Sequence, residues 1–114
     1  MGNNRKHSYK LEKKEEKSDV YYIDTIEIDQ GELQRGVEIT WFSDDTEFEI
    51  WFPKELNPFS NSNLPEQALL NSRGRRVKKR MPNNIDPGTY EYSIFCKKTN
   101  TMAEGNSPPR MIIK

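Results

Sequence analysis

Two residues suited to hold a soft metal ion lie close together near the end of the chain. Met102 follows Cys96 by six residues, and Thr99 stands midway between them. Thiolate and thioether sulfur atoms are soft ligands, which select soft metal ions. The chain has a single histidine, His7, in a charged segment near the N-terminus. We therefore expect Cys96 to be a small buried residue at the end of a core strand, and Met102 to cap that end of the core.

A run of basic residues is a second candidate site. Six cationic side chains fall within residues 73–80, namely Arg73, Arg75, Arg76, Lys78, Lys79 and Arg80. The run could bind phosphates of a nucleic acid or an acidic face of a partner protein. It could also be an exposed edge strand whose charges oppose aggregation, which is the interpretation we favour. Nucleic acid is the least favoured partner, because the net charge is zero and no nucleic-acid-binding motif is present.

Residues for catalysis are sparse. One histidine in a charged segment is a poor basis for a Ser-His-Asp or Cys-His arrangement. Asp44, Asp45, Glu47 and Glu49 are close in sequence, but they lack the spacing and the glycine of a calcium loop. No phosphate-binding glycine loop is present. The sequence thus predicts a protein that is not an enzyme and has no cofactor.

The elements that must position these residues are predicted to be short strands. Apolar and polar residues alternate over residues 26–29, 37–42, 48–52 and 90–96, which is typical of half-buried strands. Residues 75–81 and 111–113 are further strand candidates, and Pro, Gly, Asn and Asp between the runs indicate turns. The 114 residues fit one domain, and five Tyr, five Phe and two Trp supply core material. We expect an all-β antiparallel sandwich.

Two segments depart from this pattern. Residues 1–18 are rich in Lys and Glu, and we expect a charged flexible tail or a short solvated helix ahead of a domain at residues 19–114. Residues 53–72 are irregular, with residues 65–70 as the one short helix of the fold. The apolar side chains of this loop could cover a core edge, which we favour, or form a binding patch. They are Phe59, Leu64, Leu69 and Leu70.

Charge is unevenly divided along the chain. Residues 21–72 hold eleven acidic and two basic side chains, whereas residues 73–114 hold ten basic and three acidic ones. Facing strands of one sandwich could neutralise each other, or the asymmetry could mark a partner surface or allow self-association. The single cysteine excludes an intrachain disulfide. No apolar run is long enough for a secretory signal or a membrane span, so we expect a cytoplasmic protein that does not contact membranes.

Two segments together resemble the cupredoxin-like family of the plastocyanin and amicyanin type. Residues 37–45, running into residues 48–52, are similar to the family's strand, polar turn and ligand-bearing strand. Residues 87–96 read PGTYEYSIFC and are followed by Met102 and the strand at 111–113, which matches the family's PG-x-Y-x-Y-x-x-x-C signature and C-terminal ligand loop. The resemblance implies a Greek-key β-sandwich that, in the family, holds copper through two histidines, one cysteine and a weakly bound methionine.

The ligand set that the resemblance implies is incomplete in this chain. The amicyanin-type spacing C-x2-H-x2-M places Cys96 and Met102 at the cysteine and methionine positions, but Thr99 at the histidine position. Counting back from Phe52, the other histidine position falls on Phe48. A phenyl ring donates no lone pair, and a hydroxyl is a poor substitute for imidazole, so we expect no type 1 copper.

Three functions are compatible with the sequence. The favoured one is a non-catalytic cupredoxin-like module that binds an unidentified protein or small ligand. The second is a copper-binding or redox protein that uses Cys96 and Met102 with an atypical third ligand. The third is a nucleic-acid-binding protein that uses the basic run at residues 73–80.

Overall fold

Short strands make up most of the chain. The computed structural model describes residues 5–13, 15–59, 68–104 and 108–114. In chain order the elements are β1 (Arg5–Lys13), β2 (Tyr21–Tyr22), β3 (Ile26–Ile28), α1 (Gln30–Arg35), β4 (Val37–Ser43), β5 (Phe48–Phe52), the 3-10 helix η1 (Lys54–Leu56), β6 (Ala68–Asn71), β7 (Arg76–Arg80), β8 (Gly88–Glu91), β9 (Ser93–Cys96), β10 (Thr101–Met102) and β11 (Arg110–Ile113).

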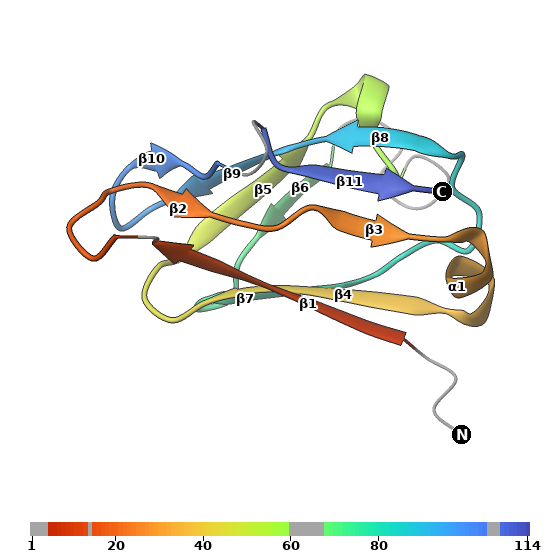
Figure 1. Ribbon diagram of the computed structural model, residues 1–114, viewed down its shortest axis with the longest axis horizontal. Coiled ribbons are helices and arrows are strands. Elements are labelled where there is room, and N and C mark those ends of the chain that lie inside the picture. Colours follow the sequence, from red (N-terminus) through yellow and green to blue (C-terminus); the bar gives the residue numbers. More distant parts are fainter. Residues whose placement is uncertain (1–4, 14, 60–67, 105–107) are drawn as a thin grey trace.

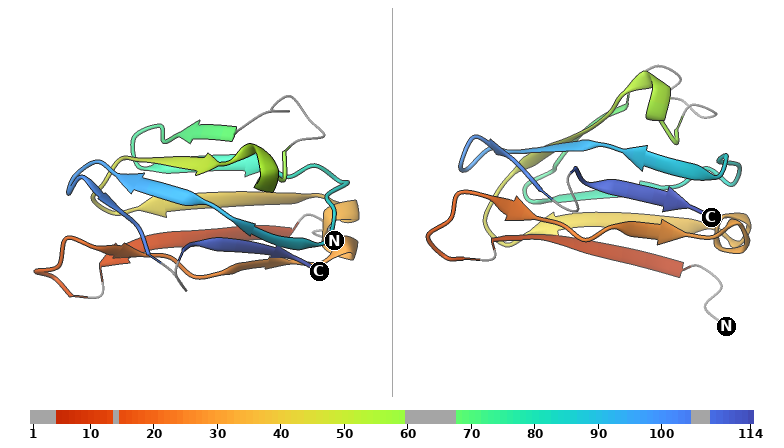
Figure 2. Two further views of the ribbon diagram at one scale, coloured as in Figure 1. Left: turned by 90° about the horizontal axis from the view of Figure 1, so that it is seen from above. Right: turned by 45° about the horizontal axis from the view of Figure 1, so that its top comes forward.

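These strands form two layers (Figures 1 and 2). One layer has the strand order β2-β1-β4-β7, and the other contains the order β10-β9-β5-β6. The three-stranded sheet β3-β11-β8 continues the second layer, because β8 and β9 follow each other almost along one line (Figure 1). The expected all-β sandwich is confirmed. Two of its pairs, β1 with β4 and β3 with β11, are parallel, whereas the other strand pairs of the described residues are antiparallel.

The core between the layers comes from the alternating runs. In β4 every second residue from Val37 to Ser43 is buried, and in β5 the same holds from Phe48 to Phe52. Trp41 Nε1–H donates a hydrogen bond to Tyr92 Oη at 3.2 Å, and the two rings meet edge to face. Phe52 stacks on the other side of this cluster, 4.7 Å from the Tyr92 ring centroid. The largest side chains therefore sit at the centre, with the indole nitrogen satisfied.

The expected flexible tail is wrong for residues 5–13, which form β1. This strand runs parallel to β4, from Arg5 opposite Val37 to Leu11 opposite Ser43. Leu11 is buried and Tyr9 packs against the core. Lys10 and Glu12 alternate with these residues, so the segment has the composition of a tail although its inward-facing residues belong to a sheet.

The helix lies where the sequence predicted a turn. Asp29 caps α1 by accepting the Glu32 N–H at 2.8 Å, and Glu32 Oε1 accepts the Asp29 N–H at 3.3 Å. This reciprocal capping box satisfies two N-terminal donors, and buried Leu33 anchors the helix to the core. The chain leaves the helix at Gly36, whose φ of 99° suits glycine.

The helix expected at residues 65–70 is wrong for residues 68–70, which belong to β6; residues 65–67 lie outside the described residues. The backbone of β6 pairs with β5, and this pairing outweighs the helical preference of Ala and Leu. The core-covering role is confirmed for Phe59, which is buried edge-on against Phe52. Leu69 is half exposed, and Leu64 lies outside the described residues. Among helices of the described residues, none is long and apolar enough to cross a membrane.

Candidate functional site

Cys96 ends β9 and lies directly opposite Phe48 on β5. Both side chains point into the core and have no exposed surface. Burial, with a smaller contribution from the negative charge of Asp45, raises the pKa of the Cys96 thiol to about 11. The thiol is therefore neutral at neutral pH, and the phenyl ring opposite it offers no ligand atom. The prediction that Cys96 is a small buried residue is confirmed.

Met102 and Thr99 engage other parts of the structure. In the register of β10 on β9, Thr101 lies opposite Cys96, and Met102 lies opposite Phe95. Because successive side chains of a strand alternate between faces, Met102 lies on the outer face and is 50% exposed. The expectation that Met102 caps the core is therefore wrong. Thr99 Oγ1 lies 2.6 Å from Thr101 Oγ1, whose own proton goes to the Asp19 carbonyl, so Thr99 is the donor of this pair.

His7 lies at the other end of the molecule. Its Nε2 is 3.0 Å from Glu32 Oε2 on α1, and its Nδ1 is 2.8 Å from Tyr9 Oη. Burial opposes ionisation of Glu32, but hydrogen bonds from His7 and the Asp29 backbone outweigh it and hold the pKa of Glu32 below its usual value. In Figure 1, α1 and the turn between β9 and β10 lie at opposite ends of the sandwich. His7 is thus occupied by α1 and distant from Cys96.

A polar network closes the end of the sandwich near Cys96. Tyr21 Oη donates to Asp45 Oδ1 at 3.0 Å, and Lys98 Nζ lies 3.3 Å from Asp45 Oδ2. Burial, followed by the hydrogen bond to Asp45, raises the pKa of Tyr21 to about 12. Burial opposes ionisation of Asp45, but the hydrogen bonds from Tyr21 and Lys98 outweigh it and lower the pKa of Asp45. The polar groups at this end therefore satisfy one another.

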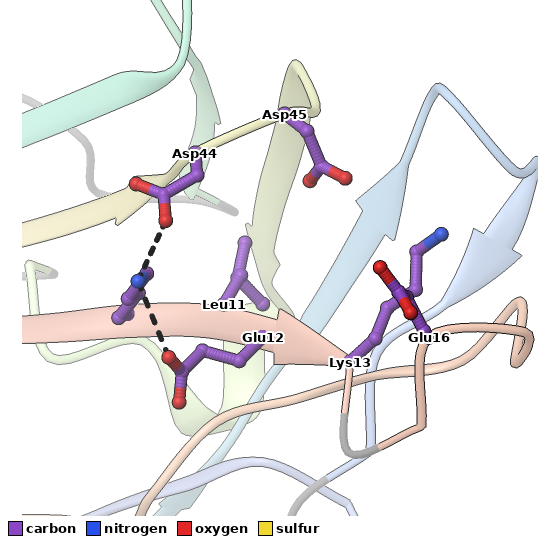
Figure 3. A pocket seen from close by; sticks show the side chains of 7 residues that line it. Leu11, Glu12, Lys13, Glu16, Asp44 and Asp45 are labelled. Carbon is purple, nitrogen blue, oxygen red and sulfur yellow. Dashed lines mark ion pairs between the residues drawn. The ribbon is translucent and has the colours of Figure 1, made fainter.

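A hollow of about 350 Å³ lies beside this network (Figure 3). Its lining residues are Lys10, Leu11, Glu12, Lys13, Glu16, Asp44 and Asp45. Lys10 Nζ lies 2.7 Å from Asp44 Oδ2 and 3.2 Å from Glu12 Oε1, and both ion pairs are drawn in Figure 3. Lys10 thus pairs with two of the four carboxylates of this hollow, and a third, that of Asp45, is engaged by Tyr21 and Lys98.

The basic run occupies the turn after β6 and all of β7. Arg76, Lys78 and Arg80 alternate with buried Val77 and half-buried Lys79, so the first three stand on the outer face. Lys79 Nζ lies 5.4 Å from the centroid of the Phe59 ring. In the described part of the chain, Arg73, Arg76 and Arg80 make no ion pair, and Lys78 Nζ is 3.9 Å from Glu38 Oε1. The cations of β7 are therefore mostly available to a partner.

A groove of about 510 Å³ lies between β6 and β7. Its lining residues are Leu69, Leu70, Asn71, Arg73, Arg76, Val77, Lys78 and Lys79, and we call it the basic groove. β6 is the edge of one layer and β7 is the edge of the other. The predicted edge strand is confirmed, since β7 pairs only with β4 among the described strands. Sequence reasoning found the cations and kept Leu69 and Leu70 as a possible binding patch, but it did not bring the two together, because it placed these leucines in a helix.

Known structures share this architecture. No protein-family model and no curated protein matches the sequence. Pseudoazurin from Hyphomicrobium denitrificans is similar with a TM-score of 0.52 at 10% identity, over 96% of this chain and 75% of that one. Auracyanin A, a "blue" copper protein from Chloroflexus aurantiacus, has a TM-score of 0.50 at 10% identity, over 97% and 99% of the two chains. The fold is cupredoxin-like. At this level of identity the likeness concerns the fold alone.

The residues that the resemblance matches to copper ligands have different surroundings in this structure. Cys96 points into the core while Met102 points out of the same sheet, so the two sulfur atoms do not face a common point. Phe48 lies opposite Cys96, and the Thr99 hydroxyl is engaged with Thr101. Among the described residues, no group of three His, Cys, Asp or Glu is arranged to hold a metal ion. A type 1 copper centre requires imidazole nitrogen and thiolate sulfur as ligands in one plane.

Proposed function

We propose that this cupredoxin-like domain is a non-catalytic binding module without type 1 copper, and that it binds an acidic partner protein through the basic groove. The observation that carries the proposal is that cations without ion pairs and exposed apolar surface lie together in one groove. Arg73 and Arg76 make no ion pair among the described residues, and Leu69 beside them is 51% exposed. Such a surface suits a partner that carries both carboxylates and apolar side chains.

A protein partner fits the groove better than a nucleic acid. A nucleic-acid site gains affinity from many phosphate contacts and usually belongs to a strongly basic domain, whereas this chain has a formal net charge of zero. Acidic residues elsewhere on the chain would repel a long polyanion, but they would matter less to a short acidic segment confined to the groove. A reducing, cytoplasmic setting is part of the proposal, since the single cysteine is free and buried.

Neutralising the basic groove should weaken binding of an acidic peptide about 30-fold. Exposed ion pairs contribute roughly 0.2–1 kcal/mol each, so three of them amount to about 2 kcal/mol. The variant is Arg73→Gln/Arg76→Gln/Lys78→Gln, and the probe is a fluorescent peptide of alternating Glu and Val measured by anisotropy. Raising the salt concentration should narrow the difference between variant and parent, because exposed charges are screened.

The matched control removes the same charge elsewhere, through Lys17→Gln/Lys54→Gln/Lys97→Gln. This control should bind the peptide within about twofold of the parent, since those side chains lie outside the groove. An equal loss in both triple variants would reduce the effect to net charge and overturn the groove as the site. Binding of duplex DNA that is tighter than peptide binding, and lost only in the groove variant, would assign the groove to nucleic acid instead.

Copper(II) should produce no intense blue thiolate-to-copper absorption in this protein. The reason is the arrangement of side chains around Cys96, whose thiol has a raised pKa and faces Phe48. The measurement is a visible absorption titration of the parent and of Cys96→Ser, with Met102→Ala as a second variant. A blue band that disappears in Cys96→Ser would overturn this part of the proposal and favour a copper or redox role with an atypical third ligand.

A further inference from the structure

We propose that the partner segment binds as an added strand along the open edge of β7. This inference rests on the proposed function and specifies its geometry: an extended segment with acidic side chains at alternate positions and apolar side chains between them. Three independent features carry it. They are the hydrogen-bonding direction of the β7 backbone, the spacing of its outer cations, and the apolar lining of the groove beside it.

The register of β4 and β7 fixes which backbone groups of β7 are open. The Ser43 N–H donates to the Arg75 carbonyl at 3.0 Å, and the Met81 N–H donates to the Val37 carbonyl at 2.8 Å. In an antiparallel pair such bonded positions recur at every second residue, so Val77 and Lys79 also bond to β4. The N–H and C=O groups of Lys78 and Arg80 therefore point away from β4.

The turn before β7 limits where an added strand can begin. The Arg76 carbonyl points the same way as the Lys78 groups, but it accepts the Arg73 N–H at 2.9 Å. Among the described residues no strand pairs with the edge beyond that bond. The N–H and C=O groups of Lys78 and Arg80 thus remain as a template for another backbone, as is usual for the edge strand of a sheet.

The outer cations of β7 match the period of a strand. Arg76, Lys78 and Arg80 lie on one face at alternate positions, so their Cα atoms are spaced by about 6.8 Å. A strand laid beside β7 has the same period and places every second side chain opposite this row. Opposite charges at facing positions stabilise a strand pair, so the outer positions of the segment should be Glu or Asp.

The inner positions of the segment meet the groove. Side chains directed there would contact Val77, Leu69 and Leu70, of which Leu69 is 51% exposed. Apolar side chains at these positions would remove that surface from water. A second copy of β7 is a poor occupant, because pairing β7 with itself would set two rows of cations against each other. The occupant that the charges select is an acidic and apolar segment of another protein.

Two comparisons test strand addition separately from charge. Lys78→Ala removes the charge and keeps the backbone N–H, whereas Lys78→Pro removes both while sparing the bonds to β4. The alternating Glu-Val peptide should bind Lys78→Pro about tenfold more weakly than Lys78→Ala, since a ladder hydrogen bond is lost. Polyacrylate, which has carboxylates but no peptide backbone, should bind the two variants equally. Amide hydrogen exchange of Lys78 and Arg80 in the parent should slow with the peptide and not with polyacrylate.

The outcomes distinguish the inference from the function on which it rests. Equal peptide binding by Lys78→Pro and Lys78→Ala, with no slowing of exchange at Lys78 and Arg80, overturns strand addition and leaves charge-based binding at the groove intact. Absence of binding for both peptide and polyacrylate overturns the proposed function as well. If Lys78→Pro does not fold, the exchange measurement in the parent decides, supported by a peptide whose amides are N-methylated at alternate positions and which should bind more weakly.

Discussion

Deletion of residues 1–13 should abolish cooperative unfolding of the domain, although the deleted segment has the composition of a solvated tail. The deletion removes all of β1, and with it the parallel pairing to β4 and the buried Leu11 side chain. Loss of a buried leucine alone costs about 2–5 kcal/mol, against a total stability of roughly 5–15 kcal/mol for a domain. β4 would also lose the strand on one side and expose the neighbours of Trp41. Urea titrations followed by near-ultraviolet circular dichroism and tryptophan fluorescence measure the effect.

Two variants make this result specific to β1. Deletion of residues 1–4, which precede the strand, should leave the unfolding midpoint nearly unchanged. Leu11→Ala should fall between the two deletions, because it keeps the backbone pairing with β4 and loses only the side chain. A chain without residues 1–13 that still unfolds cooperatively at the parent midpoint would contradict the assignment of β1 to the folded core.

Trp41→Ala should lower the free energy of unfolding by about 3–5 kcal/mol, the range for removing a fully buried aromatic side chain. Trp41 has no exposed surface and packs edge to face against Tyr92. Its Nε1–H donates to Tyr92 Oη, so truncation also leaves a buried hydroxyl without this partner. Burial raises the pKa of Tyr92 well above its usual value, which keeps that hydroxyl neutral at any ordinary pH. Equilibrium denaturation of each variant is the measurement.

Trp51 supplies the matched control for this prediction. It is 40% exposed on the outer face of β5, so Trp51→Ala should cost much less than Trp41→Ala. Tyr92→Phe removes the hydroxyl while keeping the ring and should cost about 1 kcal/mol. Equal losses for the two tryptophan variants would place the centre of the core elsewhere than between Trp41, Phe52 and Tyr92.

The sequence predicts the central strands well because their physical signal is local. In β4, β5 and β9 every second residue is apolar, and burial follows that alternation. The sequence does not predict β1, because few of its side chains face inward and its partner β4 is remote in sequence. The helix α1 does carry a local signal, the pair Asp29 and Glu32 at capping-box spacing, which a turn interpretation of Gly31 overlooks.

The candidate site also has features that the sequence predicts and features that it does not. The burial of Cys96 follows from its position in an alternating run, whereas the outward direction of Met102 depends on the register of β10 and could not be read from spacing. The cations of β7 are visible as a sequence run. The groove beside them cannot be read from the sequence, because it forms where the edges of two different layers meet. Properties of one strand were predictable, and properties of a junction between strands were not.

The parallel pairing of β3 with β11 has a consequence for the order in which this chain can fold during synthesis. It joins Ile26 to Met111, so β3 must wait for a partner strand that is made much later in the chain. Contacts that are so distant in sequence form slowly, because a long loop must close before the pairing contributes any stability. Until residues 110–113 leave the ribosome, β3 lacks this neighbour and its apolar side chains need protection from aggregation. Completion of the second layer therefore comes well after the synthesis of β3.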